Sequence, residues 1–424
     1  MSEKTTYEQP ELYCRSASVH FIYSFTLTSA GGNMLFPKDL ATADSHLKPG
    51  TPEERKTSIS PHLALKTTSA WSREPEDPVP GRIGDLRASL QTLVRLFPSG
   101  GVCTFCVRAK SPASANSPGQ PDRRLRASDV QTILRLVDTP RSPLYFAEDG
   151  EAERQETLYG RFREIVSRLA NGLGGKWMDA EYLEDADCDG QSPWVVTVLE
   201  VDGAAADAFC GLGDSGDDPA RTKMMRLRKY ERVVAPILFR SVAANLIVEP
   251  AYVQPPTPVG VPGLFSVNLD ARLFVCMSRR SILCICESQE DNPASYFVPS
   301  LLDICEMVRA RWNSLVLLNT YLDECLRSLL LARLAPSKRA EMVENARSFR
   351  FRLATCLEDP SMYIVAGDAL SKIQSDLSQV FRTDSLREGL LQKMKLLDQL
   401  YEDSIQLEWL PVRDRAIREM EQDS

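Results

Sequence analysis

Histidine is scarce in this sequence. The 424 residues include three, and these, His20, His46 and His62, all fall within the first 62 positions. A Ser-His-Asp or Cys-His mechanism would have to take its base from that stretch. His20 lies in an aromatic and β-branched segment typical of a sheet core, and no serine or cysteine has a Gly-rich nucleophile elbow beside it. We therefore predict no catalytic residues; a hydrolase with a Cys or Ser nucleophile and His20 as base is the enzymatic alternative.

Long apolar runs are missing as well. No window reaches the roughly 18 consecutive apolar residues that a membrane helix requires. The longest candidate, residues 314–334, carries Asp323, Glu324 and two arginines, which indicates a packed helix. The first sixteen residues lack the apolar core of a signal peptide. We therefore expect a cytoplasmic protein without an integral membrane span.

Positive charge is outweighed by negative charge. With 58 acidic and 50 basic residues the net charge is -8, which argues against a general nucleic-acid binder. The basic residues gather in residues 221–232, where the spacing predicts an amphipathic helix. These residues are our candidate partner-binding site: Arg221, Lys223, Arg226, Arg228, Lys229 and Arg232. They either bind an acidic partner, RNA or an anionic membrane surface, or pair with the acidic loop just before them.

Cysteine is present eleven times, an odd number without a secretion signal, which favours reduced thiols. Cys103 and Cys106 form a CxxC pattern, and Cys284 and Cys286 form a CxC pattern. Four thiolates could bind zinc, and one pair could act in redox chemistry. However, residues three apart on a strand point to opposite faces, and cysteine is readily buried. We therefore interpret these four as core thiols and predict no metal site.

Two glycine-rich segments and one acidic segment could in principle bind a cofactor. Residues 171–177 lack the spacing and the final Ser or Thr of a phosphate-binding loop, and residues 210–220 are acidic, which repels phosphate. Residues 181–189 carry five carboxylates but lack the Gly and the closing Glu of a calcium-binding loop. We therefore predict no cofactor.

Residue patterns predict an α+β fold. Aromatic and β-branched runs predict strands at 16–27, 100–110 and 193–203, and two or three more within 263–288. Apolar residues at helical spacing predict helices at 84–97, 128–138, 151–173, 297–334 and 338–357, and two more within 361–419. We therefore divide the chain into a mixed α/β domain, residues 1–295, with a mobile Pro/Ser-rich insertion at about 31–80, and a bundle of long antiparallel helices, residues 296–424.

Three phrases in this order resemble the CorA-like proteins of bacteria. "ARLFVCMSRRSILCICE" (271–287) is similar to the last strand pair of their α/β domain. "FVPSLLDICEMVRARWNSLVLLNTYLDECLRSLL" (297–330) is similar to the first long helix after it. Residues 349–381 followed by "LREGLLQKMKLLDQLYED" (386–403) resemble the helix pair that leads toward the membrane. The resemblance implies an α/β domain that passes into stalk helices.

The chain differs from that family in the segments that form the ion-conducting pore. Its transporters carry two C-terminal membrane helices and a Gly-Met-Asn pore motif. Here the nearest sequence is "GGNM" at Gly31 to Met34, in another order and in the other half of the chain. After "QLEW" (406–409) the chain continues with Pro411 and dense charge, which cannot enter a bilayer core. The resemblance therefore implies a relative without a pore, and no ion-conducting residue carries over.

The C-terminal helices offer the clearest interaction surface. Leu386, Leu390, Met394, Leu397 and Leu400 form an apolar stripe at helical spacing. Such a stripe suits packing within the chain, self-association or a protein partner. We therefore expect a non-enzymatic regulatory or interaction protein that acts through helix-mediated assembly. An adaptor or regulator of a multi-gene bacterial defence-type system is the alternative binding function.

Overall fold

The computed structural model describes residues 12–29, 48–49, 71–72, 78–83, 86–97, 100–110, 125–138, 144–146, 154–172, 175–178, 193–210, 237–238, 264–267, 273–277, 281–287, 294–332 and 368–422. These residues form an α+β protein that divides into two compact units. Unit 1 comprises Met1–Ala310 and Tyr363–Phe381. Unit 2 comprises Arg311–Met362 and Arg382–Ser424.

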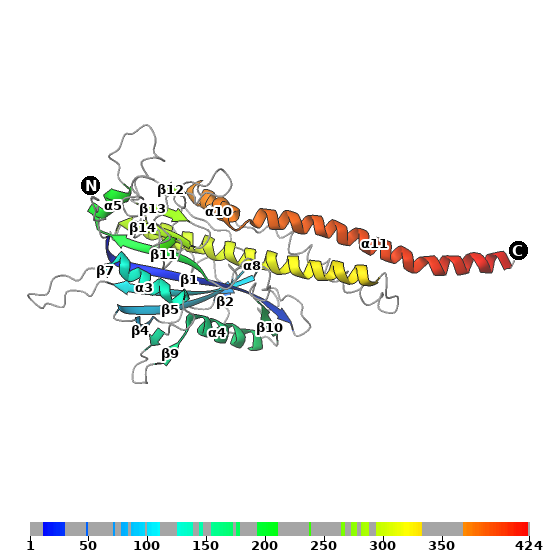
Figure 1. Ribbon diagram of the computed structural model, residues 1–424, viewed down its shortest axis with the longest axis horizontal. Helices are drawn as coiled ribbons and strands as arrows, with labels where there is room; N and C mark the ends of the chain where they lie inside the picture. Colours follow the sequence, from blue (N-terminus) through cyan, green and yellow to red (C-terminus); the bar gives the residue numbers. More distant parts are fainter. Residues whose placement is uncertain are drawn as a thin grey trace, which may run out of the picture. The chain divides into compact units, whose positions relative to one another are not determined.

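Unit 1 is built on a mixed β-sheet with the strand order β12-β13-β14-β11-β1-β6-β5-β4-β8-β9 (Figure 1). Along this order the described neighbours are antiparallel, except that β11 and β14 are parallel. The strands are β1 (Tyr13–Ser29), β4 (Val79–Ile83), β5 (Leu86–Phe97), β6 (Gly100–Lys110), β8 (Leu144–Phe146), β9 (Arg154–Glu156), β11 (Trp194–Val201), β12 (Leu264–Val267), β13 (Leu273–Met277) and β14 (Ser281–Glu287). Short strands β2 (Lys48–Pro49), β3 (Trp71–Ser72), β7 (Leu125–Arg126) and β10 (Gly175–Met178) pair beside this path.

One face of the sheet, called here the apolar face, carries the main hydrophobic core. Successive strand residues point to opposite faces, so Phe21, Tyr23 and Phe25 of β1 share this face. Helices α3 (Ala127–Asp138), α4 (Leu158–Gly172) and α5 (Gly203–Cys210) contribute residues to the same core. Phe162 of α4 stacks on Tyr23 with ring centroids 4.9 Å apart. Burial of each such ring stabilises the fold by about 1.5–3 kcal/mol.

The predictions for the central strands are confirmed. Each run of β-branched and aromatic residues pairs with a neighbouring strand of the sheet. Predicted strands 16–27, 100–110 and 193–203 correspond to β1, β6 and β11, and residues 263–288 contain β12, β13 and β14. Nearly every residue of β11 is buried, as the unbroken apolar run predicted. Predicted helices 128–138 and 151–173 correspond to α3 and α4, although residues 154–156 form β9 instead.

The predicted helix at residues 84–97 is wrong, since this segment is β5. The apolar residues that fit a helical period also fit an alternating one, in which Leu90, Val94 and Leu96 are buried on the apolar face. Continuous pairing with β6, from Ala88↔Ala109 to Phe97↔Gly100, selects the strand. A Cβ atom at Gly101 would lie 2.4 Å from the Phe25 ring, so any other residue here would force the buried Phe25 side chain to move.

The C-terminal helices are α8 (Ala294–Ala332), α10 (Asp368–Val380) and α11 (Thr383–Gln422). They correspond to the predicted helix 297–334 and to the two predicted within 361–419. Among the described helices, none combines the length and the apolar sequence required to cross a bilayer. The predicted helix 338–357 and most of the predicted insertion at 31–80 lie outside the described residues.

In unit 2 the second part of α8 and the start of α11 run parallel (Figure 1). Arg311 interacts electrostatically with Asp384, and further along both helices Lys393 Nζ lies 2.8 Å from the side-chain oxygen of Asn319. Lys393 also forms an ion pair with Asp323 at 2.6 Å. The predicted antiparallel order is therefore wrong for this pair, because the contacts advance along both helices in the same direction.

Candidate functional site

The other face of the sheet, called here the polar face, carries hydroxyl, imidazole and guanidinium groups. On β1 these are Ser16, Ser18, His20 and Ser24. The strand register places Cys106 of β6 opposite His20, and Thr104, two residues before Cys106, lies on the same side of β6. On β5, Arg95 pairs with Val102 and therefore lies on this face too. Buried polar side chains need hydrogen-bond or ion-pair partners. The protonation states on this face therefore depend on the side chains of the element that packs over it.

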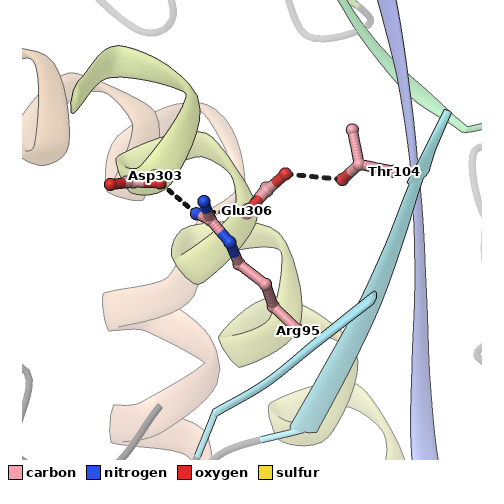
Figure 2. A network of polar contacts seen from close by, with 4 residues as sticks. All are labelled: Arg95, Thr104, Asp303 and Glu306. Atoms are coloured by element: carbon pink, nitrogen blue, oxygen red, sulfur yellow. Dashed lines mark hydrogen bonds and ion pairs between the residues drawn. The ribbon is translucent and has the colours of Figure 1, made fainter. Parts of the chain in front are cut away.

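Helix α8 supplies those partners within unit 1. Asp303 and Glu306 are three residues apart and therefore lie on the same side of the helix. Figure 2 shows both carboxylates at the guanidinium of Arg95: Nη1 donates to Asp303 Oδ1 and forms an ion pair with Glu306 Oε2 at 2.9 Å. Thr104 Oγ1 donates to Glu306 Oε1 at 2.6 Å. Two strands and one helix thus meet in a single ionic network.

The network has more negative than positive charge and little contact with water. The side chain of Glu306 is 3% exposed, while those of Asp303 and Arg95 are 20% and 28% exposed. One guanidinium faces two carboxylates, which leaves one uncompensated negative charge when both are ionised. Glu306 Oε2 is held by the ion pair without a well-aligned hydrogen bond. A buried charge without full compensation reduces the stability of the fold by several kcal/mol, unless a proton or a nearby opposite charge neutralises it.

Burial and neighbouring charges decide the protonation states of Arg95 and Glu306. Burial alone would lower the pKa of the Arg95 guanidinium, but Asp303 and Glu306 outweigh it and raise that pKa, so Arg95 stays charged. Burial raises the pKa of Glu306, and the charge of Asp303 raises it further. Arg95, whose effect is larger than that of Asp303, and the Thr104 hydroxyl both lower the pKa of Glu306, but they do not offset burial. Glu306 therefore takes up a proton more readily than an exposed glutamate does.

A second group of side chains on the polar face surrounds His20. Its Nε2 atom lies 3.2 Å from Ser18 Oγ and 3.7 Å from Cys106 Sγ. Burial, helped by Arg108, lowers the pKa of His20 to about 3, while burial raises the pKa of Cys106. A cysteine nucleophile needs the opposite states, a thiolate beside an imidazolium. The pair is therefore neutral and suited to packing.

Helix α8 has a further contact one turn after Glu306. The Arg309 guanidinium carbon lies 5.6 Å from the centre of the Phe381 ring, which follows α10. The same ring packs edge-on against Trp194 of β11 at 5.1 Å. Arg309 and Trp194 are both almost fully buried. These cation–π and aromatic contacts stabilise the packing of α8 against the sheet and against the end of α10.

The four cysteines of the CxxC and CxC patterns do not come together. Cys103 lies on the apolar face and Cys106 on the polar face, as the strand spacing predicted. Strands β6 and β14 are separated by β1 and β11, a distance of roughly 14 Å at the usual strand spacing. All four thiols are buried and unbridged. In the described part of the chain, no group of three or more His, Cys, Asp or Glu side chains could hold a metal ion.

Several predicted sites lie outside the described residues. These are the basic residues Arg221, Lys223, Arg226, Arg228, Lys229 and Arg232, together with His46, His62 and the acidic residues 181–189. The apolar stripe of α11 is described: Leu390, Leu397 and Leu400 are buried, while Leu386 and Met394 are half-buried.

The ionic network itself was missed at the sequence level. Arg95 lies in the segment predicted to be helical, and Thr104 appeared to be an ordinary strand residue. The available signal was in "LLDICEMVRA", where Asp303 and Glu306 interrupt an otherwise apolar helix at a spacing of three. Carboxylates on the buried side of a helix require a partner, so this spacing could have indicated a cation on the sheet.

No family model matches this chain, and neither does any curated protein or solved structure. Function must therefore be inferred from the chemistry of the chain's own residues. The network of Arg95, Thr104, Asp303 and Glu306 is a described site in which one buried cation and two carboxylates contact one another and the pKa of Glu306 is raised. Such perturbation is a mark of functional sites.

Proposed function

We propose that this protein is a non-enzymatic, cytoplasmic regulatory protein that acts by helix-mediated assembly. In this proposal it is a CorA-like scaffold without a pore. The observation that carries it is the continuity of α8, a single helix of 39 residues that contributes to both compact units. Its first part is held on the sheet by the network at Asp303 and Glu306. Its second part pairs with α11 through Lys393.

The pairing in unit 2 has features of a parallel coiled coil. On α8, Leu315, Leu318, Leu322 and Leu329 are buried at spacings of three, four and seven residues. On α11, Leu390, Leu397 and Leu400 are buried, and Lys393 occupies the position between the first two. A polar residue within an apolar seam favours one register over others, since only one register satisfies it. This pattern supports the assignment of residues 296–424 to a helical bundle.

Three leucines on the two long helices are exposed to water. Leu330 and Leu331 of α8 are each 50% exposed, and Leu396 of α11 is 47% exposed. Among the described residues these are, with Tyr13, the large apolar side chains that water reaches most. Removing such surface from water stabilises an assembly by about 25 cal/mol per Å². We propose that a second copy of the chain covers these leucines.

The test is the mass of the full-length protein by light scattering. Wild type is expected to form a discrete oligomer. A triple variant, Leu330→Ser, Leu331→Ser and Leu396→Ser, should be monomeric and still folded. The matched control, Arg327→Ser with Gln399→Ser, changes exposed polar positions on the same helices and should leave the mass unchanged. A wild-type protein that stays monomeric at high concentration contradicts the proposal.

A further inference from the structure

We infer that Glu306 is the proton-binding site of a latch between the sheet and α8. With the proton bound, α8 is held firmly; when the proton is lost at higher pH, the excess negative charge loosens it. The latch is a property of unit 1 and stands on its own geometry. Its consequence for assembly, which should weaken as pH rises, rests on the proposed function.

The geometry requires the network to respond to protons. Nη1 of Arg95 is shared by Asp303 Oδ1 and Glu306 Oε2, so one cation serves two anions. The Asp303 side chain is 20% exposed and is partly hydrated, whereas the Glu306 side chain is almost entirely enclosed. One proton on Glu306 makes the network neutral. The enclosed carboxyl is the position at which neutrality stabilises the buried site most.

The side chains around Glu306 can form hydrogen bonds with both its ionised and its protonated form. With Glu306 ionised, Thr104 Oγ1 donates to Oε1. A hydroxyl group can rotate and accept a hydrogen bond instead, so a protonated Glu306 can donate to Thr104. Arg95 keeps its ion pair with Asp303, and Oε2 of the neutral Glu306 stays beside Nη1 of Arg95. Proton uptake therefore reverses the direction of the hydrogen bond between β6 and α8.

The groups that face Glu306 come from three described elements. Arg95 of β5 opposes proton uptake, and the Thr104 hydroxyl of β6 opposes it weakly. On α8 itself Asp303 favours uptake, and the adjacent Cys305 thiol is fully buried and kept protonated by that burial and by both carboxylates. His20, on the neighbouring strand β1, is neutral above a pH of about 3 because burial lowers its pKa to that value.

The first experiment measures the titration of Glu306 in the full-length protein. Glutamate labelled with ¹³C at the carboxyl carbon is followed by NMR from pH 4 to pH 9, and Glu306→Gln identifies the signal by its loss. The signal should titrate clearly above the ordinary value of about 4.5. In Asp303→Asn it should move to lower pH, which also identifies it if the first variant does not fold. A Glu306 signal that titrates at or below 4.5 overturns the inference.

The second experiment follows the oligomer by light scattering across the same pH range. Wild type should dissociate as pH rises through the Glu306 titration, and Glu306→Gln should remain assembled throughout. Asp303→Asn should also remain assembled, because Glu306 then faces Arg95 without a competing carboxylate. A wild-type oligomer indifferent to pH overturns the link to assembly. A protein monomeric at every pH contradicts the proposed function, while the NMR result still decides whether the latch exists.

Discussion

The two faces of the sheet in unit 1 are stabilised by different physical means. Under α3 and α4, Phe21, Phe25 and Phe105 are fully buried. Tyr23 stacks on Phe162, and the Phe25 ring contacts Phe162 at a tilted angle. Under α8, Arg95 and Thr104 are joined to two carboxylates. Apolar burial is non-directional and roughly proportional to area, whereas an ionic contact depends on its partner's charge. The first face therefore supplies stability, and the second can respond to solution conditions.

The largest loss of stability is expected on the apolar face. Phe105→Ala removes a ring that is wholly enclosed and contacts Tyr23 at 5.9 Å between centroids. Lost transfer free energy and the remaining cavity should together reduce the free energy of unfolding by about 3–5 kcal/mol. Urea denaturation at pH 5 and pH 8 measures the loss, which should be the same at both values. Phe105→Leu is the control and should lose less; a strong pH dependence of the alanine variant would contradict the division between the faces.

On the polar face, the most damaging substitution should be Arg95→Met. It leaves Asp303 and Glu306 together without their cation, and removing one partner of a buried ion pair typically costs about 3–5 kcal/mol. Because the Arg95 side chain is 28% exposed, we expect a loss at the low end, about 3 kcal/mol at neutral pH. The loss should be smaller at low pH, where the carboxylates accept protons.

The control for Arg95→Met is the triple variant that also carries Asp303→Asn and Glu306→Gln. It removes the charges on both sides, so urea denaturation should recover much of the lost stability. If the triple variant is as unstable as Arg95→Met alone, the arginine acts mainly through packing of its aliphatic part.

The third prediction concerns the sign of the pH dependence. Burial and Asp303 raise the pKa of Glu306 above its ordinary value of about 4.5, so the folded state binds the proton more tightly than the unfolded chain. The stability contributed by Glu306 is therefore complete below pH 4.5 and is lost as pH rises through the folded-state pKa. Urea denaturation of wild type and Glu306→Gln should show curves that separate upward from pH 4.5, with the variant the more stable. Curves that separate on acidification instead would show that Arg95 dominates the site.

The sequence predicts correctly those helices and strands whose apolar residues fit only one kind of element. It does not predict the elements and contacts that are decided by residues far away in the chain. The aromatic and β-branched run of β1 and the apolar length of α8 each fit one structure. The leucines of β5 fit a helix and a strand equally, and pairing with β6 decides between them. The network joins residues about 200 positions apart, since Thr104 contacts Glu306 and Arg95 contacts Asp303. Local periodicity cannot show which side chain of a strand meets a helix that far along the chain.

The smallest effect, and the closest comparison of the two faces, comes from replacing one threonine on each with valine. Thr104, on the polar face, donates a hydrogen bond to Glu306 at 2.6 Å. Thr104→Val should reduce the free energy of unfolding by about 1.5–3 kcal/mol at a pH where Glu306 is ionised. The loss should be about 1 kcal/mol at a pH where Glu306 is protonated.

Thr197 of β11 is fully buried on the apolar face, and its hydroxyl has no hydrogen-bond partner in the described part of the chain. Thr197→Val should therefore leave stability unchanged or increase it, because it removes an unpaired polar atom at nearly constant volume. Urea denaturation of both variants at pH 5 and pH 8 makes the comparison. Equal losses would mean that the two faces do not differ in the way their polar groups are satisfied, and the latch would then lose its chemical basis.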